Sequence, residues 1–378
     1  MTLVDLDTPS LVLDRSILDR NAAAMTRRAQ ALGVTLRPHM KTAKSAEVAR
    51  VATRGNAGGI TVSTLKEAEY FAAAGFSDIV YAVSVVPARL PRIAALLRAG
   101  VDLAVVTDRI DVARALGEQC VRLGVEVPVL IELDTGEHRS GLAPGSDEVV
   151  ALGALLHDSP GVSLRGVLTH AGHSYGSRSV EAVREIAEQE RAATVGAAQR
   201  LRAAGLPCPV VSVGSTPTAV HVRSLEGVTE LRCGVYMFGD VFQSEIHSCG
   251  RGDLAVSVLA TVIGHREDLG CALIDAGALA LSKDRSTGAE GLPEDVGFGL
   301  VTDADGRERI DGMRVTRVYQ EHGLVACDGA FPFDRLPIGA RVRVYPNHVC
   351  LTAAMYDAYQ VVDGGDEVVA TWPRVNGW

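Results

Sequence analysis

The sequence is poor in lysine. Of its 37 basic residues only four are lysines, at positions 41, 44, 66 and 283, and the others are arginines. Any reaction that needs a lysine amine must therefore use one of these four. The basic residues form no run, and 46 acidic residues give a net charge of −9. Such a chain has no stretch that would neutralise a phosphate backbone, so we expect no nucleic-acid partner.

Long apolar runs and paired cysteines are also missing. No stretch approaches the roughly 18 apolar residues that span a bilayer, and residues 1–10 are acidic, without the basic start of a signal peptide. We expect no membrane partner and a cytoplasmic location. The seven cysteines are scattered and contain no CxxC pair, which is typical of a reducing compartment. We expect most of them to be small core residues.

The chain has 378 residues and 47% hydrophobic composition, enough for a large α/β domain and a smaller one. Short β-rich runs alternate with amphipathic helices that end in glycine. We predict eight strands: Thr35–Lys41, Gly59–Ser63, Asp78–Val85, Asp102–Thr107, Pro128–Asp134, Leu164–His170, Val210–Gly214 and Thr229–Cys233. Eight βα units favour a (β/α)8 TIM-like barrel. The competing doubly wound sheet would need a GxGxxG turn after its first strand, and none is present.

The pattern changes at about residue 251, where strands follow one another without crossover helices. The predicted strands are Ala255–Ile263, Ala272–Asp275, Met313–Tyr319 and Arg341–Tyr345, with a hairpin around Asp363–Asp366. This indicates an antiparallel β domain, with which the early strand Ser10–Leu13 could pair. We therefore place the barrel at residues 16–250 and the β domain at residues 1–15 plus 251–378.

The first predicted barrel strand carries unusual basic residues. Its period of two places Arg37, His39 and Lys41 on one face, and that face would point to the barrel axis if the apolar face meets the helices. Active sites of such barrels lie at the carboxyl ends of the strands. A lysine at this mouth is a candidate Schiff-base nucleophile. The alternative is a solvated lysine at the start of a helix, and we predict that role for Lys44 and Lys66, which lie in helical sequence.

The loops after strands seven and eight have the composition of a phosphate site, which is where barrels commonly bind phosphate. They contain Gly214, Ser215 and Thr216 in the first loop and Gly234 and Tyr236 in the second. Glycine lets a backbone approach an anion closely, and hydroxyls donate hydrogen bonds to it. Isolated turns of this composition would mean little, but both lie after the expected strands.

Strands five and six end in further polar residues. Arg139 can donate to a phenolate oxygen without losing its proton, and His170 or Tyr175 can stack on a ring or bond to it. Each could instead be an ordinary polar loop residue.

The predicted β domain contains a possible metal site. On an extended segment, His348 and Cys350 would project to the same side, where an imidazole and a thiolate could share one ion. A thiolate favours Zn²⁺ over Mn²⁺ or Mg²⁺. Two ligands are fewer than the usual three of catalytic zinc, so a third would be distant in sequence, or water and substrate.

Taken together, these segments resemble a known family, the fold-type III pyridoxal-phosphate (PLP) enzymes of the D-threonine aldolase and D-serine dehydratase group, which share the alanine racemase-like fold. The resemblance extends from residue 8 to residue 378. It is carried by Arg37–Thr42, Asp134–Gly136 with Arg139, Gly214–Thr218, Gln320–Gly323 and Pro346–Cys350. Residues 59–69 and 166–172 are most similar to dehydratases of D-threo-3-hydroxyaspartate, and next to eukaryotic-type D-serine dehydratases.

The resemblance implies a role for each group of candidate residues. Lys41 would form the Schiff base with PLP, and Arg139 would contact its phenolate. Four residues would surround its phosphate: Ser215, Thr216, Gly234 and Tyr236. His348 and Cys350 would bind zinc next to the substrate hydroxyl, and the protein would be a head-to-tail homodimer. Aldolases of the group resemble a His-x-Asp pair at the metal position, so His-x-Cys favours a dehydratase.

The expected function is therefore PLP- and zinc-dependent elimination of water from a D-3-hydroxy amino acid, giving a 2-keto acid and ammonia. D-threo-3-hydroxyaspartate and D-serine are the expected substrates. The alternatives are a retro-aldol lyase that releases glycine and an aldehyde, and a non-catalytic PLP carrier, which would be expected to lack the β domain. A racemase would be expected to have a tyrosine near the start of that domain, and residues 255–290 contain none.

Overall fold

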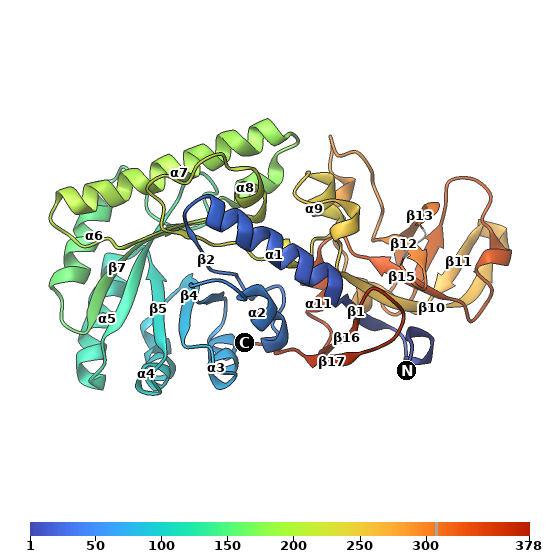
Figure 1. Ribbon diagram of the computed structural model, residues 1–378, viewed down its shortest axis with the longest axis horizontal. Helices are drawn as coiled ribbons and strands as arrows, with labels where there is room; N and C mark the ends of the chain where they lie inside the picture. The colour runs from blue at the N-terminus through green and yellow to red at the C-terminus, as the bar shows by residue number, and fades with distance from the viewer. Residues whose placement is uncertain (307–308) are drawn as a thin grey trace. The chain divides into compact units, whose positions relative to one another are not determined.

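A computed structural model describes residues 1–306 and 309–378 (Figure 1). The chain forms two compact units. One comprises Ala23–Gly234 with Gly377–Trp378, and the other comprises Met1–Ala22 with Val235–Asn376. No helix in the described part of the chain is long and apolar enough to cross a membrane.

The first unit is built on eight parallel strands. Their order is β2-β9-β8-β7-β6-β5-β4-β3. The bounds are β2 Thr35–Leu36, β3 Ile60–Val62, β4 Asp78–Ser84, β5 Asp102–Thr107, β6 Val127–Leu133, β7 Val162–Thr169, β8 Val210–Val213 and β9 Glu230–Leu231. A parallel bridge between His39 and Thr61 joins the segment after β2 to β3, so the ring of strands closes. The predicted TIM-like barrel is confirmed.

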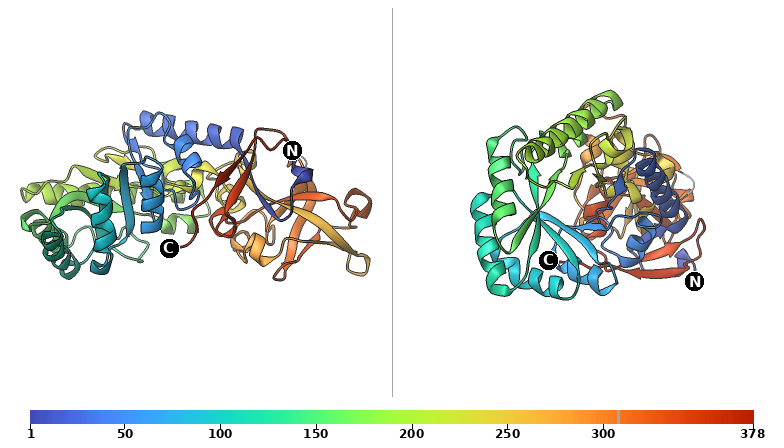
Figure 2. Two further views of the ribbon diagram at one scale, coloured as in Figure 1. Left: turned by 90° about the horizontal axis from the view of Figure 1, so that it is seen from below. Right: turned by 60° about the vertical axis from the view of Figure 1, so that its left-hand side comes forward.

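Helices follow the strands, as the glycine-punctuated pattern predicts. Their bounds are α1 Arg15–Ala31, α2 Ala46–Ala52, α3 Leu65–Ala73, α4 Leu90–Arg98, α5 Ile110–Leu123, α6 Asp147–Asp158, α7 Val180–Ala203 and α8 Thr216–His221. Helices α4 to α7, cyan to green in the right view of Figure 2, lie outside the strands. Their ends show the expected local chemistry. Thr64 caps α3 by accepting the Glu67 N–H, and Gly124 ends α5 with a φ of +66°.

One part of the barrel interior is apolar. Five buried side chains from β4 to β7 pack into a single cluster: Val80, Ala104, Val106, Leu130 and Leu168. Alternation along the strands places them on the inward face, because Leu130 shares its face with Glu132 and Val80 shares its face with Ser84. The hydroxyl of Ser84 donates to the Glu132 carboxylate at 3.2 Å.

Another part of the interior is charged. Arg37 is 6% exposed and pairs with both Glu230 and Asp78. Burial alone would lower the pKa of Arg37, but the two carboxylates outweigh it and raise the pKa. The Ser212 hydroxyl donates to Glu230, and Arg232 contacts the same hydroxyl. This network links the segment after β2 to strands β8 and β9.

The second unit is a nine-stranded, mostly antiparallel sheet with the order β11-β14-β13-β12-β15-β10-β1-β16-β17. Because β10 also pairs with β11, six of the strands close into a barrel-like ring. The bounds are β1 Ser10–Asp14, β10 Val256–Arg266, β11 Cys271–Ile274, β12 Leu300–Asp303, β13 Arg309–Val318, β14 Gly323–Ala326, β15 Arg341–Tyr345, β16 Ala358–Val362 and β17 Ala370–Pro373. The predicted pairing of the early strand is confirmed, since β1 lies between β10 and β16.

Strands β12 and β14 of this unit were not predicted from the sequence. Each has only four residues and is bounded by polar turns, so its period of two is too short to stand out. All seven cysteines are free. Four of them are buried, as expected for small core residues, namely Cys120, Cys208, Cys233 and Cys271.

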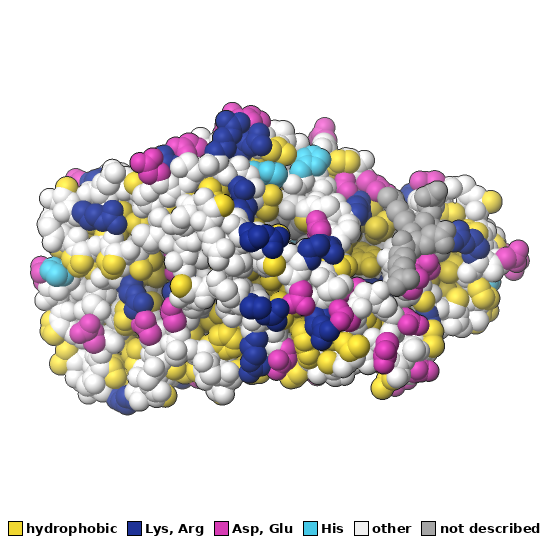
Figure 3. All heavy atoms as spheres, in the orientation of Figure 1, with side chains coloured by type: hydrophobic (Ala, Val, Ile, Leu, Met, Phe, Trp, Pro, Cys, Tyr) yellow, Lys and Arg dark blue, Asp and Glu magenta, His cyan; other side chains and the backbone are white. Residues whose placement is uncertain are grey.

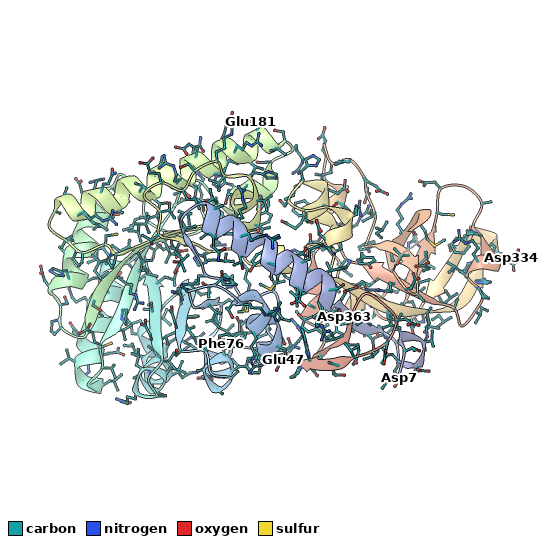
Figure 4. The ribbon with its side chains drawn as sticks, viewed as in Figure 1. Asp7, Glu47, Phe76, Glu181, Asp334 and Asp363 are labelled. Carbon is teal, nitrogen blue, oxygen red and sulfur yellow. The ribbon has the colours of Figure 1, made fainter. Side chains whose placement is uncertain are left out.

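Surface charge in the first unit is mixed. Acidic and basic side chains lie side by side at the top of Figure 3, around the N-terminal end of α7, where Figure 4 shows Glu181 projecting outward. Glu181 pairs with Arg184 and Arg223. A shallow hollow lies beside these pairs, and it contains none of the predicted site residues. It is lined by Glu181, Arg184, Glu185, Glu188, Gln189, Val222 and Arg223.

Candidate active site

Lys41 lies in a turn just beyond the bridge that closes the barrel. Its neighbours Met40 and Thr42 are buried, and Lys41 itself is exposed. Its backbone N–H donates to the Nδ1 atom of His39 at 3.3 Å. Arg37 and His39 are buried, at 6% and 8% exposure, as the alternation of the strand predicts. The structure therefore anchors the backbone on either side of Lys41 and exposes its side chain at the carboxyl end of the strand.

Lys44 differs from its predicted role as a helical surface lysine. It precedes α2, has a φ of +48°, and its Nζ lies 3.2 Å from the Oε1 atom of the fully buried Glu67. The Ser63 hydroxyl donates to the same oxygen. The prediction was wrong because the helix begins two residues later, after Ser45. Lys66 does lie exposed in α3, as predicted.

Two histidines near Lys41 are held neutral. Burial, and after it the charges of Lys41, Arg232 and Arg139, lower the pKa of His170 to about 3 and that of His39 well below its ordinary value. The Nδ1 atom of His170 donates to the Gly214 carbonyl at 2.9 Å, whereas Nδ1 of His39 accepts from Lys41. The neutral His170 ring therefore carries its proton on Nδ1, whereas the neutral His39 ring carries it on Nε2. The surrounding cations favour an anionic ligand.

Arg139 lies on a loop after β6 that is folded around Asp134. One oxygen of Asp134 accepts the N–H groups of Gly136 and His138 at 2.9 and 3.0 Å, and His138 has a φ of +58°. The Arg139 side chain is 55% exposed, and its Nη1 lies 3.5 Å from Glu137. The loop thus holds a guanidinium near the two neutral histidines.

The loop after β7 packs tightly against the Arg139 loop. A Cβ atom on Gly172 would lie 2.1 Å from the carboxylate of Glu137, so a larger residue there would require the Glu137 side chain to move. Tyr175 lies in η3, which spans Gly172–Gly176, and its ring centroid is 6.4 Å from that of His170 at an interplanar angle of 50°. This pair offers an aromatic surface beside the lysine.

The two glycine loops bring backbone and hydroxyl donors together. Gly214 has a φ of +139°, and a Cβ there would lie 2.6 Å from the Arg232 carbonyl; at Gly234 it would lie 2.7 Å from the His39 carbonyl. Ser215 caps α8 by accepting the Thr218 N–H at 3.2 Å, and its hydroxyl meets that of Ser174 at 2.8 Å. The two glycines thus let the loops pack closely against neighbouring backbone, and the hydroxyl groups of Ser215 and Ser174 lie together beside them.

The remaining predicted phosphate residues are also buried. Thr216 is 2% exposed and is the first residue of α8. Tyr236 is 7% exposed and lies in η4, Val235–Met237, two residues after Gly234. The described residues of the barrel unit therefore fit PLP: an accessible lysine, an arginine, an aromatic surface and hydroxyl-rich loops.

His348 and Cys350 do interact, but not through the predicted extended segment. His348 is the extended N-cap of α11, Val349–Ala353, and Cys350 lies in the first turn of that helix. Burial opposes the charged form of His348, but its hydrogen bonds to Asp284 and Cys350 outweigh this and raise its pKa to about 11. The prediction that both side chains project from one extended segment was wrong, because the strand ends at Tyr345 and a helix begins at Val349.

Two carboxylates that the sequence analysis missed lie beside this pair. Asp284 has an oxygen 3.8 Å from Nδ1 of His348. Asp240, which is 3% exposed, accepts the Val349 N–H at 3.1 Å. Burial raises the pKa of Asp240 to about 6. Within residues 1–306 and 309–378, no three His, Cys, Asp or Glu side chains gather as a metal-binding group. Among the described residues, this pair could therefore supply a metal with two side-chain ligands.

Two further missed residues lie in the barrel unit. Arg232 is 5% exposed and donates to the Thr169 carbonyl at 2.6 Å, and Glu190 is 2% exposed within α7. The sequence contains a pattern that could have identified each of these two residues. Glu230 and Arg232 alternate around a buried Leu231 just as Arg37 and His39 do around Pro38. Glu190 interrupts the apolar stripe of an amphipathic helix.

Comparison with known proteins defines the class. Residues 13–241 match the family described as alanine racemase, N-terminal domain, and residues 255–362 match a putative serine dehydratase domain. The first match covers more than half of the chain, and the chain belongs to this family, within the group that contains D-serine dehydratases and D-threonine aldolases. The resemblance proposed from the sequence is confirmed.

Individual relatives span the whole chain. It is 50% identical to the D-threo-3-hydroxyaspartate dehydratase of Delftia sp. (strain HT23), over all of this chain and 99% of that protein. It is 30% identical to a D-serine dehydratase of Dictyostelium discoideum, over 99% and 98% of the two chains. A D-threonine aldolase of Arthrobacter sp is 32% identical, over 96% and 91%.

A solved structure supports the same relationship. It is that of a D-threo-3-hydroxyaspartate dehydratase with a cysteine-to-alanine substitution, in the metal-free form. It has a TM-score of 0.95 with 49% identity, and all of both chains is covered.

The neutral state of His170 predicts a particular dependence of stability on pH. The unfolded chain takes up this proton near pH 6.5, whereas the folded protein does so only near pH 3. Because the unfolded state binds more protons between these values, the free energy of unfolding should fall as the pH decreases from about 6.5. His170→Asn, whose amide can still donate to the Gly214 carbonyl, should reduce this slope. Urea unfolding at a series of pH values tests the slope, and an NMR titration of the His170 ring near pH 6.5 would contradict the assignment.

Proposed function

We propose that this protein is a PLP-dependent lyase that eliminates water from a D-3-hydroxy amino acid to give a 2-keto acid and ammonia. D-threo-3-hydroxyaspartate and D-serine are the proposed substrates. The observation that carries the proposal is 50% identity, over the whole chain, to a dehydratase of the first compound. Lys41, surrounded by neutral imidazoles and arginines, supports it independently.

The residues that would hold PLP come from the barrel unit and the segment directly after it. Lys41 would bind it covalently, Arg139 would donate to its phenolate, and His170 with Tyr175 would lie against its ring. Gly214, Ser215, Thr216, Gly234 and Tyr236 would hold its phosphate, and His39 would fix the Lys41 turn. When bound, PLP supplies an electron sink for negative charge at the substrate Cα.

The chemical work proposed for Lys41 is proton transfer at the substrate Cα. Lys41 is the exposed lysine beside His39, whereas the amine of Lys44 is engaged by the buried Glu67. A general base must reach the proton it removes, and an exposed amine on an anchored turn can do so. His39 and His170 stay neutral beside it, so they add no positive charge of their own at the site.

We also propose that His348 and Cys350 bind zinc. The thiolate favours this ion over Mn²⁺ or Mg²⁺, and a cysteine-to-alanine relative of the same fold is described as metal-free. Asp284 lies within reach of the His348 ring and would orient it, as carboxylates commonly do for ligating histidines. A bound zinc ion would supply a Lewis acid for the leaving hydroxyl, because hydroxide is a poor leaving group.

Three further properties belong to this proposal. The protein would act as a homodimer, and it would be cytoplasmic. The functional domains would be residues 16–250 for PLP and residues 1–15 with 251–378 for the metal. Light scattering of the purified protein at several concentrations would test the proposed mass of a dimer.

Substrate assays separate the proposed reaction from its rival. D-threo-3-hydroxyaspartate should give oxaloacetate and ammonia, and D-serine should give pyruvate and ammonia. D-threonine distinguishes the reaction types, since 2-oxobutyrate with ammonia indicates a dehydratase and glycine with acetaldehyde indicates an aldolase. Glycine as the main product would overturn the dehydratase assignment. Bound PLP without turnover of any D-3-hydroxy amino acid would indicate a carrier.

Lys41→Ala should abolish both the visible absorbance of bound PLP and the activity, because no other lysine is exposed at this site. Borohydride reduction of the unsubstituted protein followed by peptide mapping should place the cofactor on Lys41. The surface variant Lys66→Ala is the matched control and should retain both properties. Label on Lys44, Lys66 or Lys283 would overturn the assignment.

Cys350→Ala should weaken zinc binding through loss of the thiolate, while PLP binding by the barrel residues persists. Elimination should collapse, and exchange of the substrate Cα proton with solvent should continue. Metal content by mass spectrometry, PLP absorbance and proton exchange by NMR measure the three properties separately. Cys327→Ala, a partly exposed cysteine on another loop, is the control. Full dehydratase activity in metal-stripped protein would refute the role of the pair.

A further inference from the structure

The phosphate-binding loop has an unusual support in the interior of α7. Six of the buried residues of this helix form a helical stripe, at positions 183, 187, 190, 194, 197 and 201, and all are apolar except Glu190 and Thr194. Thr194 satisfies its hydroxyl locally by donating to the Glu190 carbonyl at 2.6 Å. Because position 190 belongs to this buried stripe, the Glu190 carboxylate projects from the core face of the helix.

That carboxylate bridges the ends of two neighbouring strands. Its Oε1 atom accepts the Gly214 N–H at 2.8 Å and the Ala171 N–H at 3.2 Å. The parallel ladder between β7 and β8 pairs Leu168 with Ser212, and the strands end at Thr169 and Val213. Glu190 thus takes the place of ladder partners just where the two strands give way to loops.

Side chains hold both backbone polar groups of Gly214. Glu190 holds its N–H, and His170 donates to its carbonyl at 2.9 Å. Gly214 leads into Ser215, whose hydroxyl caps α8. Glu190 also hydrogen-bonds to the Thr218 side chain in that helix. Strand end, loop and helix are therefore tied to one buried side chain.

The charges around Glu190 are compatible with a carboxylate in this position. Burial raises its pKa to about 6, while the Gly214, Thr218 and Ala171 hydrogen bonds and the charge of Arg232 oppose this rise. An acceptor with three protein donors needs no external ligand. Its function must therefore be sought in what it holds in place.

We propose that Glu190 is a positioning residue for the cofactor phosphate, which fixes the Gly214 peptide and the Ser215–Thr218 turn in the conformation that receives it. This inference rests on the proposed function, because it assumes that PLP is the ligand. Glu190 does not touch the cofactor in this scheme. It acts through the Gly214 loop. Its loss should therefore weaken binding of the cofactor phosphate and leave binding of the rest of the cofactor unchanged.

Comparison of PLP with pyridoxal, which lacks the phosphate, tests this role. In Glu190→Ala the Kd for PLP should rise about tenfold or more, since charge-assisted hydrogen bonds at two backbone amides are lost. The Kd for pyridoxal should stay nearly unchanged. Glu190→Gln retains an acceptor oxygen and should restore PLP affinity to within about threefold. Binding to cofactor-free protein is measured by absorbance or by fluorescence quenching, independently of activity.

The matched control is Glu188→Ala on the same helix, where the carboxylate is 57% exposed and pairs with Arg191. It should leave both affinities unchanged. If Glu190→Ala does not fold, Glu190→Asp takes its place with the same expectation, because its shorter stem cannot reach both amides.

Each outcome is decisive. Equal weakening of PLP and pyridoxal, unchanged PLP affinity in the alanine or aspartate variant, or no rescue by glutamine would each overturn the positioning role. Failure of the unsubstituted protein to bind PLP would instead overturn the proposed function.

Discussion

The candidate site depends on the ion pair between Arg37 and Glu230 inside the barrel. Arg37 lies four residues before Lys41, and Glu230 lies four residues before Gly234. Glu230 also accepts from Ser212, two residues before Gly214. One buried network therefore fixes the three strand ends that carry the lysine and both glycine loops. Breaking a buried pair by removing one partner typically costs about 3–5 kcal/mol, and loss of Glu230 would leave Arg37 with Asp78 as its remaining ion-pair partner.

This network also explains the electrostatics of the site. A core filled only with apolar side chains could not hold Arg232 at 5% exposure. Here the charges of Glu230, Glu190 and Glu132 surround it and oppose the fall of its pKa on burial. Burial, reinforced by the positive charges of Lys41 and Arg139, lowers the pKa of His39 and of His170, so both nearby histidines stay neutral. The site can thus attract anionic groups while keeping uncharged imidazoles.

The fold was predictable because it repeats. Eight βα units repeat the same pattern eight times, so the prediction of a barrel holds even when single strand boundaries are wrong by a few residues. Strand β2 is an example, since it ends at Leu36 instead of Lys41. The β unit offers no such redundancy, and its four-residue strands β12 and β14 were missed. Candidate site residues could be selected from the sequence where polar groups stand at strand ends. Asp240 and Asp284 come from loops, where polar residues are ordinary, so nothing in the sequence distinguished them.

The metal pair and Glu190 show two different limits of pattern-based inference. His348 and Cys350 were paired by assuming a strand, yet they meet because an extended N-cap is followed by the first turn of a helix. Side chains two residues apart can approach each other in either geometry. His348 and Cys350 therefore meet although the predicted strand was wrong. Glu190 shows the opposite case, since its helix was predictable but the carboxylate on the apolar stripe was overlooked. A charged residue that keeps the helical spacing of a core stripe must find donors inside the protein, because burial without them is too costly. Here the donors are the strand ends at the proposed cofactor loop. Such a residue therefore indicates a polar site beneath a helix even before the fold is known.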